Sequence, residues 1–229
     1  MFGRTKNDTA SVVRFLAEQV RRDISFGVLA PDTKLKIEEL RQRYGGSAHS
    51  FREALTLLAA DGIVEANAQR GFRVASATQA DLEDIARLRA EIECLGLRWS
   101  MKHGDVAWES VLVAANHTLA RAEQNLSSDP ESYALEWDEA GRAFHAALVS
   151  ACQSPRLIDM QARLYDQSRR FRLAELKEGR IDLGASRASH DAIVAAALEG
   201  NCDSAVAALQ RDILGALAAK GDGSQELAG

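Results

Sequence analysis

Strand-forming patterns occur at one place in this sequence, and the longer segments around it have the periodicity of helices. Ile63-Val64-Glu65 and Phe72-Arg73-Val74 are short alternating runs, and the polar turn between them ends at Gly71. Two such runs around a glycine-bearing turn are typical of a β-hairpin. Few prolines and many Ala, Leu, Glu and Arg residues favour helix elsewhere. The chain is therefore expected to be mainly α-helical, with one small hairpin.

The residues before the hairpin predict three helices. Apolar residues at helical spacing cover residues 10–26 and, after a turn, residues 37–44. Ser47 can then cap a further helix that runs to about Ala60. The order helix, short helix, turn, helix and hairpin is that of a winged helix-turn-helix.

The residues after the hairpin predict helices alone. Apolar residues recur there every three or four positions, as in a helical bundle. The expected helices cover residues 79–102, 105–126, 130–151, 155–177, 185–199 and 202–219. The predicted fold class is mainly α, with a winged helix-turn-helix domain at residues 1–76 and an all-α six-helix bundle at residues 77–229. Residues 1–9 are expected to fray, and the tail from Gly221 is expected to be disordered.

Charge is distributed unevenly between these two parts. The chain has a formal net charge of −5, but residues 1–76 contain 12 Lys and Arg against 9 Asp and Glu. The remaining residues contain 16 basic and 24 acidic side chains. A net charge of +3 in the first part and −8 in the second suggests one surface for an anionic partner and a separate acidic body.

Composition excludes several classes of protein. Hydrophobic residues make up 46% of the chain, which is ample for a packed core. No apolar run approaches the ~20 residues that cross a bilayer, and the N-terminus lacks the apolar segment of a secretion signal. The three cysteines, Cys94, Cys152 and Cys202, are too far apart for a disulfide framework. The sequence therefore predicts a cytoplasmic protein with no membrane partner.

An ordered set of residues runs from the second expected helix to the hairpin. It consists of Leu40, Gly45, Ser47, Arg52-Glu53-Ala54-Leu55, Leu58, Gly62-Ile63-Val64 and Arg70-Gly71. This set resembles the DNA-binding domain of the GntR family of bacterial transcriptional regulators. The resemblance implies a homodimer that binds an inverted-repeat operator in double-stranded DNA.

The resemblance places the DNA contacts at the start of the helix after Ser47 and at the hairpin. Short polar side chains and free N–H groups at a helix N-terminus can meet phosphates or base edges, and an arginine one turn later can bind guanine with two hydrogen bonds. In the hairpin, a glycine allows close approach and an arginine reaches phosphate or the minor groove. The predicted DNA-binding residues are Arg41, Ser47, His49, Ser50, Arg52, Arg70 and Gly71.

Two positions depart from the family pattern. Glu38 and Ala48 stand where the family commonly has arginine. Each difference removes a cation, and Glu38 would repel phosphate. Nearby cations could compensate: Arg41, Arg43, Lys34 or Lys36. The operator is therefore expected to differ from the commonest sites of the family or to be bound more weakly.

A second ordered set follows in the expected bundle. It consists of Arg89, Glu93, Phe144-His145, His190 and a Gly200 to Ala205 segment of small residues. This set resembles the FCD effector domain of the FadR subgroup, and six helices match the shorter, VanR-like variant. The resemblance implies a regulator, not an enzyme, whose bundle binds a small organic acid.

Many proteins of that subgroup bind a divalent metal through an Asp, a His one turn later and two further His. Carried over by position, these ligands are Gly141, His145, His190 and Asp212, so the first is missing. Two imidazoles and a carboxylate still suit one zinc-like or nickel-like ion. Asp138, two turns before His145, could replace the missing ligand. Alternatively the metal has been lost, and the histidines line a polar interior that holds an anion.

Arg89 is the candidate contact for the carboxylate of the effector, because a guanidinium matches a carboxylate with two hydrogen bonds. With His145 and His190 it forms the expected effector site. Its alternative role is an ion pair with Glu93, four residues further along the helix.

Two other functions stay open at this point. The first is a metal-dependent helical-bundle enzyme that acts on a small organic acid through His145, His190 and Asp212. No nucleophile context, phosphate loop or paired-carboxylate motif supports it. The second is a DNA-binding protein whose bundle only dimerises.

Overall fold

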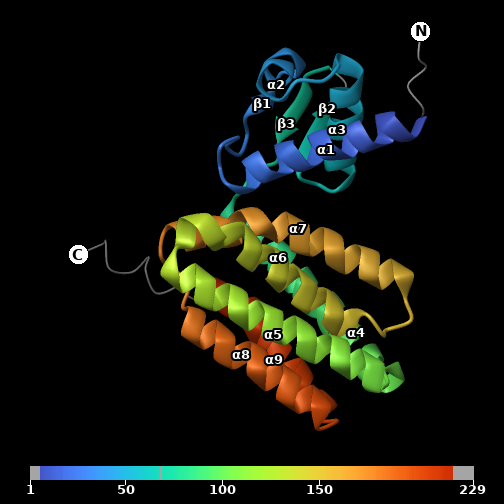
Figure 1. Ribbon diagram of the computed structural model, residues 1–229, viewed down its shortest axis with the longest axis vertical. Helices are drawn as coiled ribbons and strands as arrows, with labels where there is room; N and C mark the ends of the chain where they lie inside the picture. Colours follow the sequence, from blue (N-terminus) through green and yellow to red (C-terminus); the bar gives the residue numbers. More distant parts are fainter. Residues whose placement is uncertain (1–5, 68, 219–229) are drawn as a thin grey trace. The chain divides into compact units, whose positions relative to one another are not determined.

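The computed structural model of the chain (Figure 1) describes the backbone of residues 6–67 and 69–218 and the side chains of residues 10–67 and 69–215. Two compact units are present, one formed chiefly by the residues up to Thr78 and the other chiefly by those from Gln79 onward. The prediction for the tail from Gly221 lies outside the described residues, and that for residues 1–9 lies partly outside them.

Within the described residues, the first unit consists of three helices and a small antiparallel sheet. Its elements are α1 (Lys6–Ser25), β1 (Lys34–Leu35), α2 (Ile37–Tyr44), α3 (Ala48–Ala60), β2 (Val64–Asn67) and β3 (Gly71–Val74). The strand order is β1-β3-β2, with Leu35 opposite Phe72 and Asn67 opposite Gly71. The unit is a winged helix-turn-helix, as predicted.

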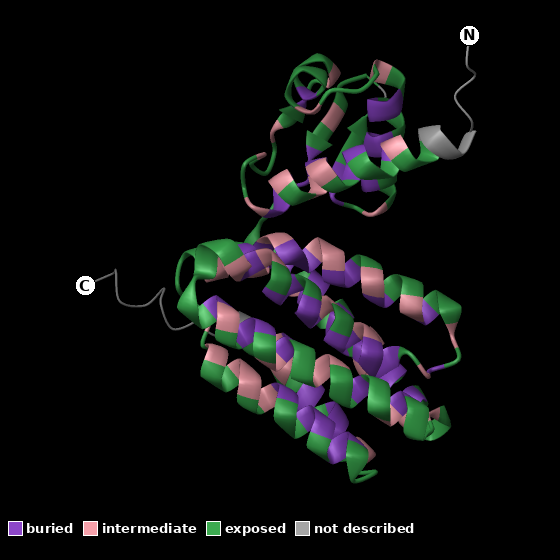
Figure 2. Cartoon of the chain, in the orientation of Figure 1, coloured by how far each residue is buried: buried purple, intermediate pink, exposed green. Residues whose placement is uncertain are grey.

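One apolar core joins the helices and the sheet of the first unit. Val20 on α1 and Phe51 and Leu55 on α3 are completely buried, and Val74 on β3 closes the same core. Figure 2 shows buried residues on the facing sides of α1 and α3. Burial of a large apolar side chain contributes about 1.5–3 kcal/mol. This core therefore fixes one face of α3 and leaves the other face to solvent.

The turn from α2 into α3 is short, and its backbone conformation follows from three consecutive residues. Gly45 and Gly46 both have positive φ, at 74° and 87°, a conformation that glycine adopts without strain. Ser47 then caps α3, since its Oγ accepts a hydrogen bond from the backbone N–H of Ser50 at 3.0 Å. The cap satisfies one of the N–H groups that the first turn of a helix leaves unpaired.

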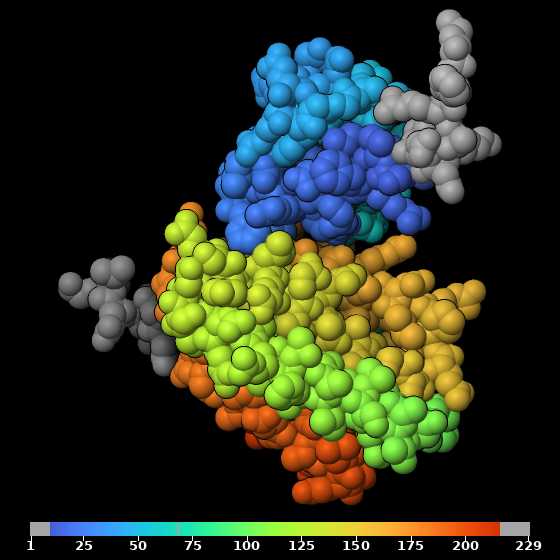
Figure 3. Space-filling view, in the orientation of Figure 1, coloured from blue at the N-terminus to red at the C-terminus, as the bar shows by residue number. Residues whose placement is uncertain are grey.

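The second unit is all-helical in its described part and has the six predicted helices. They are α4 (Gln79–His103), α5 (Val106–Ser128), α6 (Pro130–Val149), α7 (Pro155–Lys177), α8 (Leu183–Leu198) and α9 (Cys202–Ala218). α5 packs along α6, and α8 packs along α9 (Figure 3). α9 also packs against α4. Gly96 lets α4 approach α6 closely, because a Cβ there would lie 2.6 Å from Val149 Cγ1. No helix in the described part of the chain combines the length and hydropathy of a transmembrane span.

Most helix ends lie within two residues of those predicted. α1 is the exception, since it begins at Lys6, within the residues expected to fray, and not at residue 10. α2 and α7 have the predicted bounds. α8 begins two residues before the expected position, because the side chain of Asp182 caps it by accepting a hydrogen bond from Ala185 N. β1 was not predicted, since it has only two residues and its partner strand lies almost forty positions away.

Candidate DNA-binding surface and metal centre

The exposed face of α3 carries the first group of predicted DNA-binding residues. His49 and Arg52 are exposed near the start of the helix. Arg52 has no hydrogen-bond or ion-pair partner for its side chain among the described residues. A guanidinium keeps its charge at any physiological pH, so Arg52 is available to an anion outside the chain.

Two other members of this group contact their neighbours on the same helix. Ser50 is buried, and its Oγ lies 2.9 Å from that of Ser47, so the two hydroxyls are hydrogen-bonded. Nε2 of His49 lies 3.1 Å from Oε1 of Glu53, and both side chains are exposed. Among the described residues of α3, Arg52 is therefore the cation without a partner, and a carboxylate lies beside His49.

Arg41 on α2 is exposed but paired. Its Nη1 lies 2.9 Å from Oε1 of Glu38, and its Nε donates a hydrogen bond to the carbonyl of Gly46 at 3.4 Å. Arg41 thus neutralises the carboxylate that departs from the family pattern. An exposed pair of this kind is worth at most about 1 kcal/mol, so a phosphate can compete with Glu38 for the guanidinium.

The wing presents the last two predicted residues. Arg70 and Gly71 are exposed, and Gly71 has a φ of 79°, which favours glycine. The side chain of Asn67 holds the turn, since its Oδ1 accepts hydrogen bonds from the N–H groups of Gln69 and Arg70 at 3.0 and 3.1 Å. The wing therefore carries an exposed cation next to backbone N–H groups that Asn67 binds.

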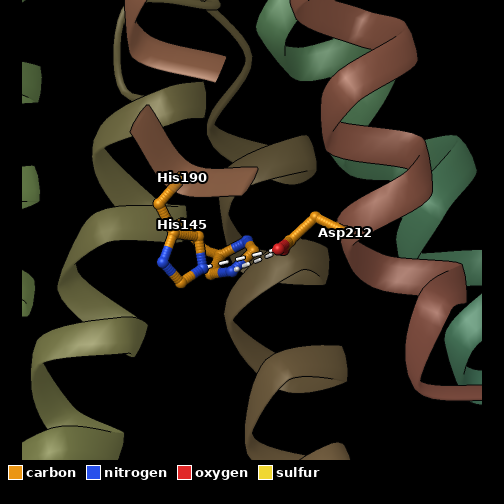
Figure 4. Close-up of side chains that lie close together, drawn as sticks. All are labelled: His145, His190 and Asp212. Atoms are coloured by element: carbon orange, nitrogen blue, oxygen red, sulfur yellow. Dashed lines mark ion pairs between the residues drawn. The ribbon is translucent and has the colours of Figure 1, made fainter. Parts of the chain in front are cut away.

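Three residues from three helices converge in the interior of the second unit. His145 comes from α6, His190 from α8 and Asp212 from α9, and their nearest ligand atoms all lie within 4.8 Å of one another (Figure 4). Nε2 of His145 lies 3.7 Å from Asp212 Oδ2, and Nε2 of His190 lies 3.5 Å from Oδ1. Both histidines are buried. Asp138 is buried on the same helix as His145 but does not belong to this cluster.

Glu93 on α4 connects Arg89 to His145. Its Oε1 accepts a hydrogen bond from Arg89 Nε at 2.8 Å, and its Oε2 lies 2.6 Å from His145 Nδ1. Arg89 also donates to Ser168 Oγ at 3.3 Å, and its guanidinium lies 4.7 Å from the centre of the Tyr165 ring. The ion pair with Glu93, the alternative role considered for Arg89, is the arrangement that this structure contains.

The neighbours of Glu93 keep its carboxylate ionised. Burial alone would raise its pKa, but the charges of Arg89 and His145 and their hydrogen bonds outweigh burial and lower the pKa from 4.5 to about 2. Because the pKa is lowered by folding, these interactions stabilise the folded chain above about pH 5, and the contribution is lost as the pH falls toward 2.

A second buried carboxylate, Glu123 on α5, joins Arg187 to His190. Its Oε1 lies 3.2 Å from His190 Nδ1, and its Oε2 accepts a hydrogen bond from Arg187 Nη1 at 3.3 Å. Arg187 also bonds Asn116 and pairs with Asp191 at 2.6 Å. Neither Glu123 nor Arg187 was predicted from the sequence, because 64 positions separate them and neither belongs to a motif.

Gly141, which stands where the family has an aspartate, faces Tyr165. A Cβ at position 141 would lie 2.6 Å from Oη of Tyr165. Tyr165 is buried, and its hydroxyl donates to the backbone carbonyl of Asp138 at 3.5 Å. The space that a ligand side chain at position 141 would need is therefore filled by a phenol.

The fit between Gly141 and Tyr165 can be measured by a double-mutant cycle. Overpacking a core typically costs about 1–3 kcal/mol, so Gly141→Ala should be less favourable in the wild type than in a Tyr165→Phe background by about that amount. Tyr165→Phe removes the oxygen that the new methyl group would meet. Chemical denaturation of the four proteins gives the coupling energy, and a coupling near zero would show that the two side chains do not compete for space.

Comparison with known protein families matches both units. Residues 13–74 match the gntR family of bacterial regulatory proteins, and residues 84–214 match the FCD domain. The chain belongs to the GntR family. Its second unit is an FCD domain, as the FadR-type resemblance implied.

Relatives of this GntR-family chain are named as transcriptional regulators. The HTH-type regulator BphR of Paraburkholderia xenovorans (strain LB400) is 38% identical over 162 residues, which span 71% of this chain and 66% of BphR. The HTH-type repressor GlaR of Escherichia coli (strain K12) is 34% identical over 172 residues, which span 75% of this chain and 77% of GlaR. The chain is therefore a transcriptional regulator and not an enzyme.

Solved structures have the same fold as this chain. McbR/YncC of E. coli aligns with a TM-score of 0.74 at 18% identity and covers 93% of this chain and 99% of its own. A GntR-type regulator from Rhodococcus sp. RHA1 aligns with a TM-score of 0.72 at 22% identity, over 92% and 98% of the two chains. At these identities the likeness shows the fold alone.

Proposed function

We propose that this regulator acts in the bacterial cytoplasm and binds an inverted-repeat DNA operator as a homodimer, through α3 and the wing of each copy. The observation that carries the proposal is the exposed Arg52 on α3, which has no partner among the described side chains. The N-terminal part of α3 enters the major groove of the DNA. There Ser47 and His49 lie near the sugar–phosphate backbone, and Arg52 reaches a base or a phosphate. Arg70 and Gly71 of the wing contact phosphate or the minor groove.

The homodimer is supported by an apolar row on α4. Leu88, Leu95 and Trp99 are 43%, 40% and 38% exposed, and their spacing places them on one face of the helix. Exposed apolar rows of this kind mark protein interaction sites. Glu91 and Arg98 are exposed on either side of Leu95 along α4, and Arg98 also pairs with Asp203 of the same chain at 3.1 Å. Two antiparallel copies of α4 would bring Glu91 of one copy close to Arg98 of the other. We assign this face to a second copy of the chain.

The assignment of the α4 face can be tested by sedimentation. Leu95→Glu would bring two like charges to the centre of the interface, and it should convert the dimer into a monomer without loss of helix content. Val113→Glu on α5 changes an equally exposed apolar residue and should leave the dimer intact. A Leu95→Glu protein that stays dimeric would exclude this face.

We further propose that His145, His190 and Asp212 hold one divalent ion of the zinc or nickel class. Imidazole nitrogens and a carboxylate are ligands that such ions prefer, and here they come from three helices that the core fixes. Three protein ligands leave coordination positions open, and the cation would supply a positive charge that attracts a carboxylate. This supports the sensing of a small organic acid beside His145 and His190. A contact of the effector with Arg89 requires that the acid displace Glu93 from the guanidinium.

Regulation by such an effector requires that it bind two arrangements of the dimer with different affinity. A panel of divalent metals and small organic acids, followed by thermal unfolding, tests this role. A metal should raise the unfolding temperature, and an acid should raise it further in the presence of that metal. An unfolding temperature that no member of the panel changes would favour a bundle that only dimerises.

A further inference from the structure

A buried carboxylate lies beside Nδ1 of each histidine of the candidate metal centre. Nδ1 of His145 lies 2.6 Å from Oε2 of Glu93, which is completely buried. Nδ1 of His190 lies 3.2 Å from Oε1 of Glu123, which is also buried. The two carboxylates come from different helices, α4 and α5, and lie on the sides of the imidazoles that do not face Asp212.

Each carboxylate is in turn held by an arginine through its other oxygen. Oε1 of Glu93 accepts from Arg89 at 2.8 Å, and Oε2 of Glu123 accepts from Arg187 at 3.3 Å. Two Arg–Glu–His networks of contacts are therefore present. Each ends at a histidine that lies beside Asp212. Nε2 of each histidine points toward one oxygen of Asp212, at 3.7 and 3.5 Å (Figure 4).

This arrangement favours Nε2 of each histidine as the metal ligand. A metal-binding imidazole is neutral, and an ionised carboxylate can only accept, so the single proton of such an imidazole lies on Nδ1, beside the glutamate. The lone pair of Nε2 is then directed to the same side as Asp212. Two lone pairs and a carboxylate are all acceptors, and a cation between them would satisfy the three groups at once. Carboxylate–histidine pairs of this kind orient metal-binding imidazoles and raise their basicity.

We propose that Glu93 and Glu123 are positioning residues that fix both imidazoles with Nε2 directed at a divalent cation. Arg89 and Arg187 act through these carboxylates and do not contact the cation. The inference rests on the proposed metal site and assigns to four further residues a function within it. It also gives Arg89, the residue considered first for the effector, a role that its observed contacts support.

The two Arg–Glu–His networks differ in the contact between glutamate and histidine. The contact between Glu93 and His145 is a short hydrogen bond, whereas His190 Nδ1 and Glu123 Oε1 are 3.2 Å apart without the geometry of one. Glu93 should therefore matter more than Glu123 for the affinity of the site.

Calorimetric titration of Zn²⁺ into the metal-free full-length chain tests this inference. Glu93→Gln and Glu123→Gln should each weaken binding by roughly 10–100-fold, with the larger loss for Glu93→Gln. Glu91→Gln, which changes an exposed glutamate of the same helix as Glu93, should leave the affinity unchanged. Because Glu93→Gln leaves Arg89 without its carboxylate, the double variant Arg89→Met/Glu93→Gln is measured too and should show the same loss.

A second readout identifies the coordinating nitrogen. In ¹⁵N spectra of the Zn²⁺-loaded wild type, the ring protons of His145 and His190 should reside on Nδ1, with Nε2 bound to the metal. Ring protons on Nε2 in the Zn²⁺-loaded wild type would overturn the inference. Zn²⁺ affinity that is equal in the wild type and both glutamine variants would also overturn it while leaving the metal site intact. A wild type that does not bind Zn²⁺ would instead refute the site itself, and the inference with it.

Discussion

A variant in which Arg52 is replaced by alanine should lose specific operator binding and still fold as the wild type does. The side chain is exposed and makes no internal contact within the described part of the chain, so its removal leaves no buried group unpaired. A bidentate contact of arginine with guanine is worth about 1–3 kcal/mol, and a homodimer loses it at both half-sites. Fluorescence anisotropy with labelled operator DNA should show a loss of roughly 30-fold to 10⁴-fold in affinity at constant salt.

Arg14 supplies the control for this experiment. It is an exposed arginine of α1 in the same unit, and Arg14→Ala removes the same charge from a different helix. This variant should keep nearly the affinity of the wild type, because one phosphate-directed charge has only a general and salt-dependent effect. If Arg52→Ala bound the operator as well as Arg14→Ala did, α3 would not be the recognition helix.

The second large effect is a loss of bound metal when a histidine of the cluster His145, His190 and Asp212 is replaced. His145→Ala and His190→Ala each remove one of three ligands, and the metal content of the purified protein should fall to background. The loss of affinity should exceed the roughly 10–100-fold that is usual for residues behind a ligand. Elemental analysis of protein purified without chelators measures the content directly.

His117 provides the matched control for these two variants. It is exposed on α5 and does not belong to the cluster, so His117→Ala should keep the metal content of the wild type. A wild-type protein that contains no zinc, nickel or related ion after such a purification would contradict the proposed site. Equal metal content in all three variants and the wild type would place the ion elsewhere.

The sequence predicted the fold well where the signals are local. The glycines at positions 45 and 46, the cap at Ser47 and the apolar spacing of the helices each act within a few residues, and the structure follows them. The missed strand β1 depends on pairing with β3, a contact between distant residues. Periodicity and turn residues carry no information about such a partner.

The candidate metal centre was predicted only in part, for the same reason. His145, His190 and Asp212 could be named from a family pattern, and the structure brings them together. Glu123 and Arg187 belong to no motif, and only the packing of α5 against α8 brings Glu123 to Arg187 and His190. The sequence also could not explain why a glycine occupies position 141. The explanation is Tyr165 on a different helix, which fills the space that a side chain at position 141 would need.

Ion pairs reduce the free positive charge of the first unit. Arg41 is paired with Glu38, and His49 with Glu53, so the side of the first unit that we propose binds DNA has less free positive charge than its arginine content suggests. Binding per monomer should therefore be modest, strongly dependent on the dimer and steeply reduced by salt.

Selection of bound sequences from a random pool of double-stranded DNA, with the full-length chain, tests the central claim most directly. The account predicts enrichment of one short inverted repeat whose half-sites are separated by about one helical turn, and no enrichment with Arg52→Ala. A pool that stays unenriched with the wild type, or that yields a single unpaired half-site, would contradict recognition of an operator by a homodimer through α3.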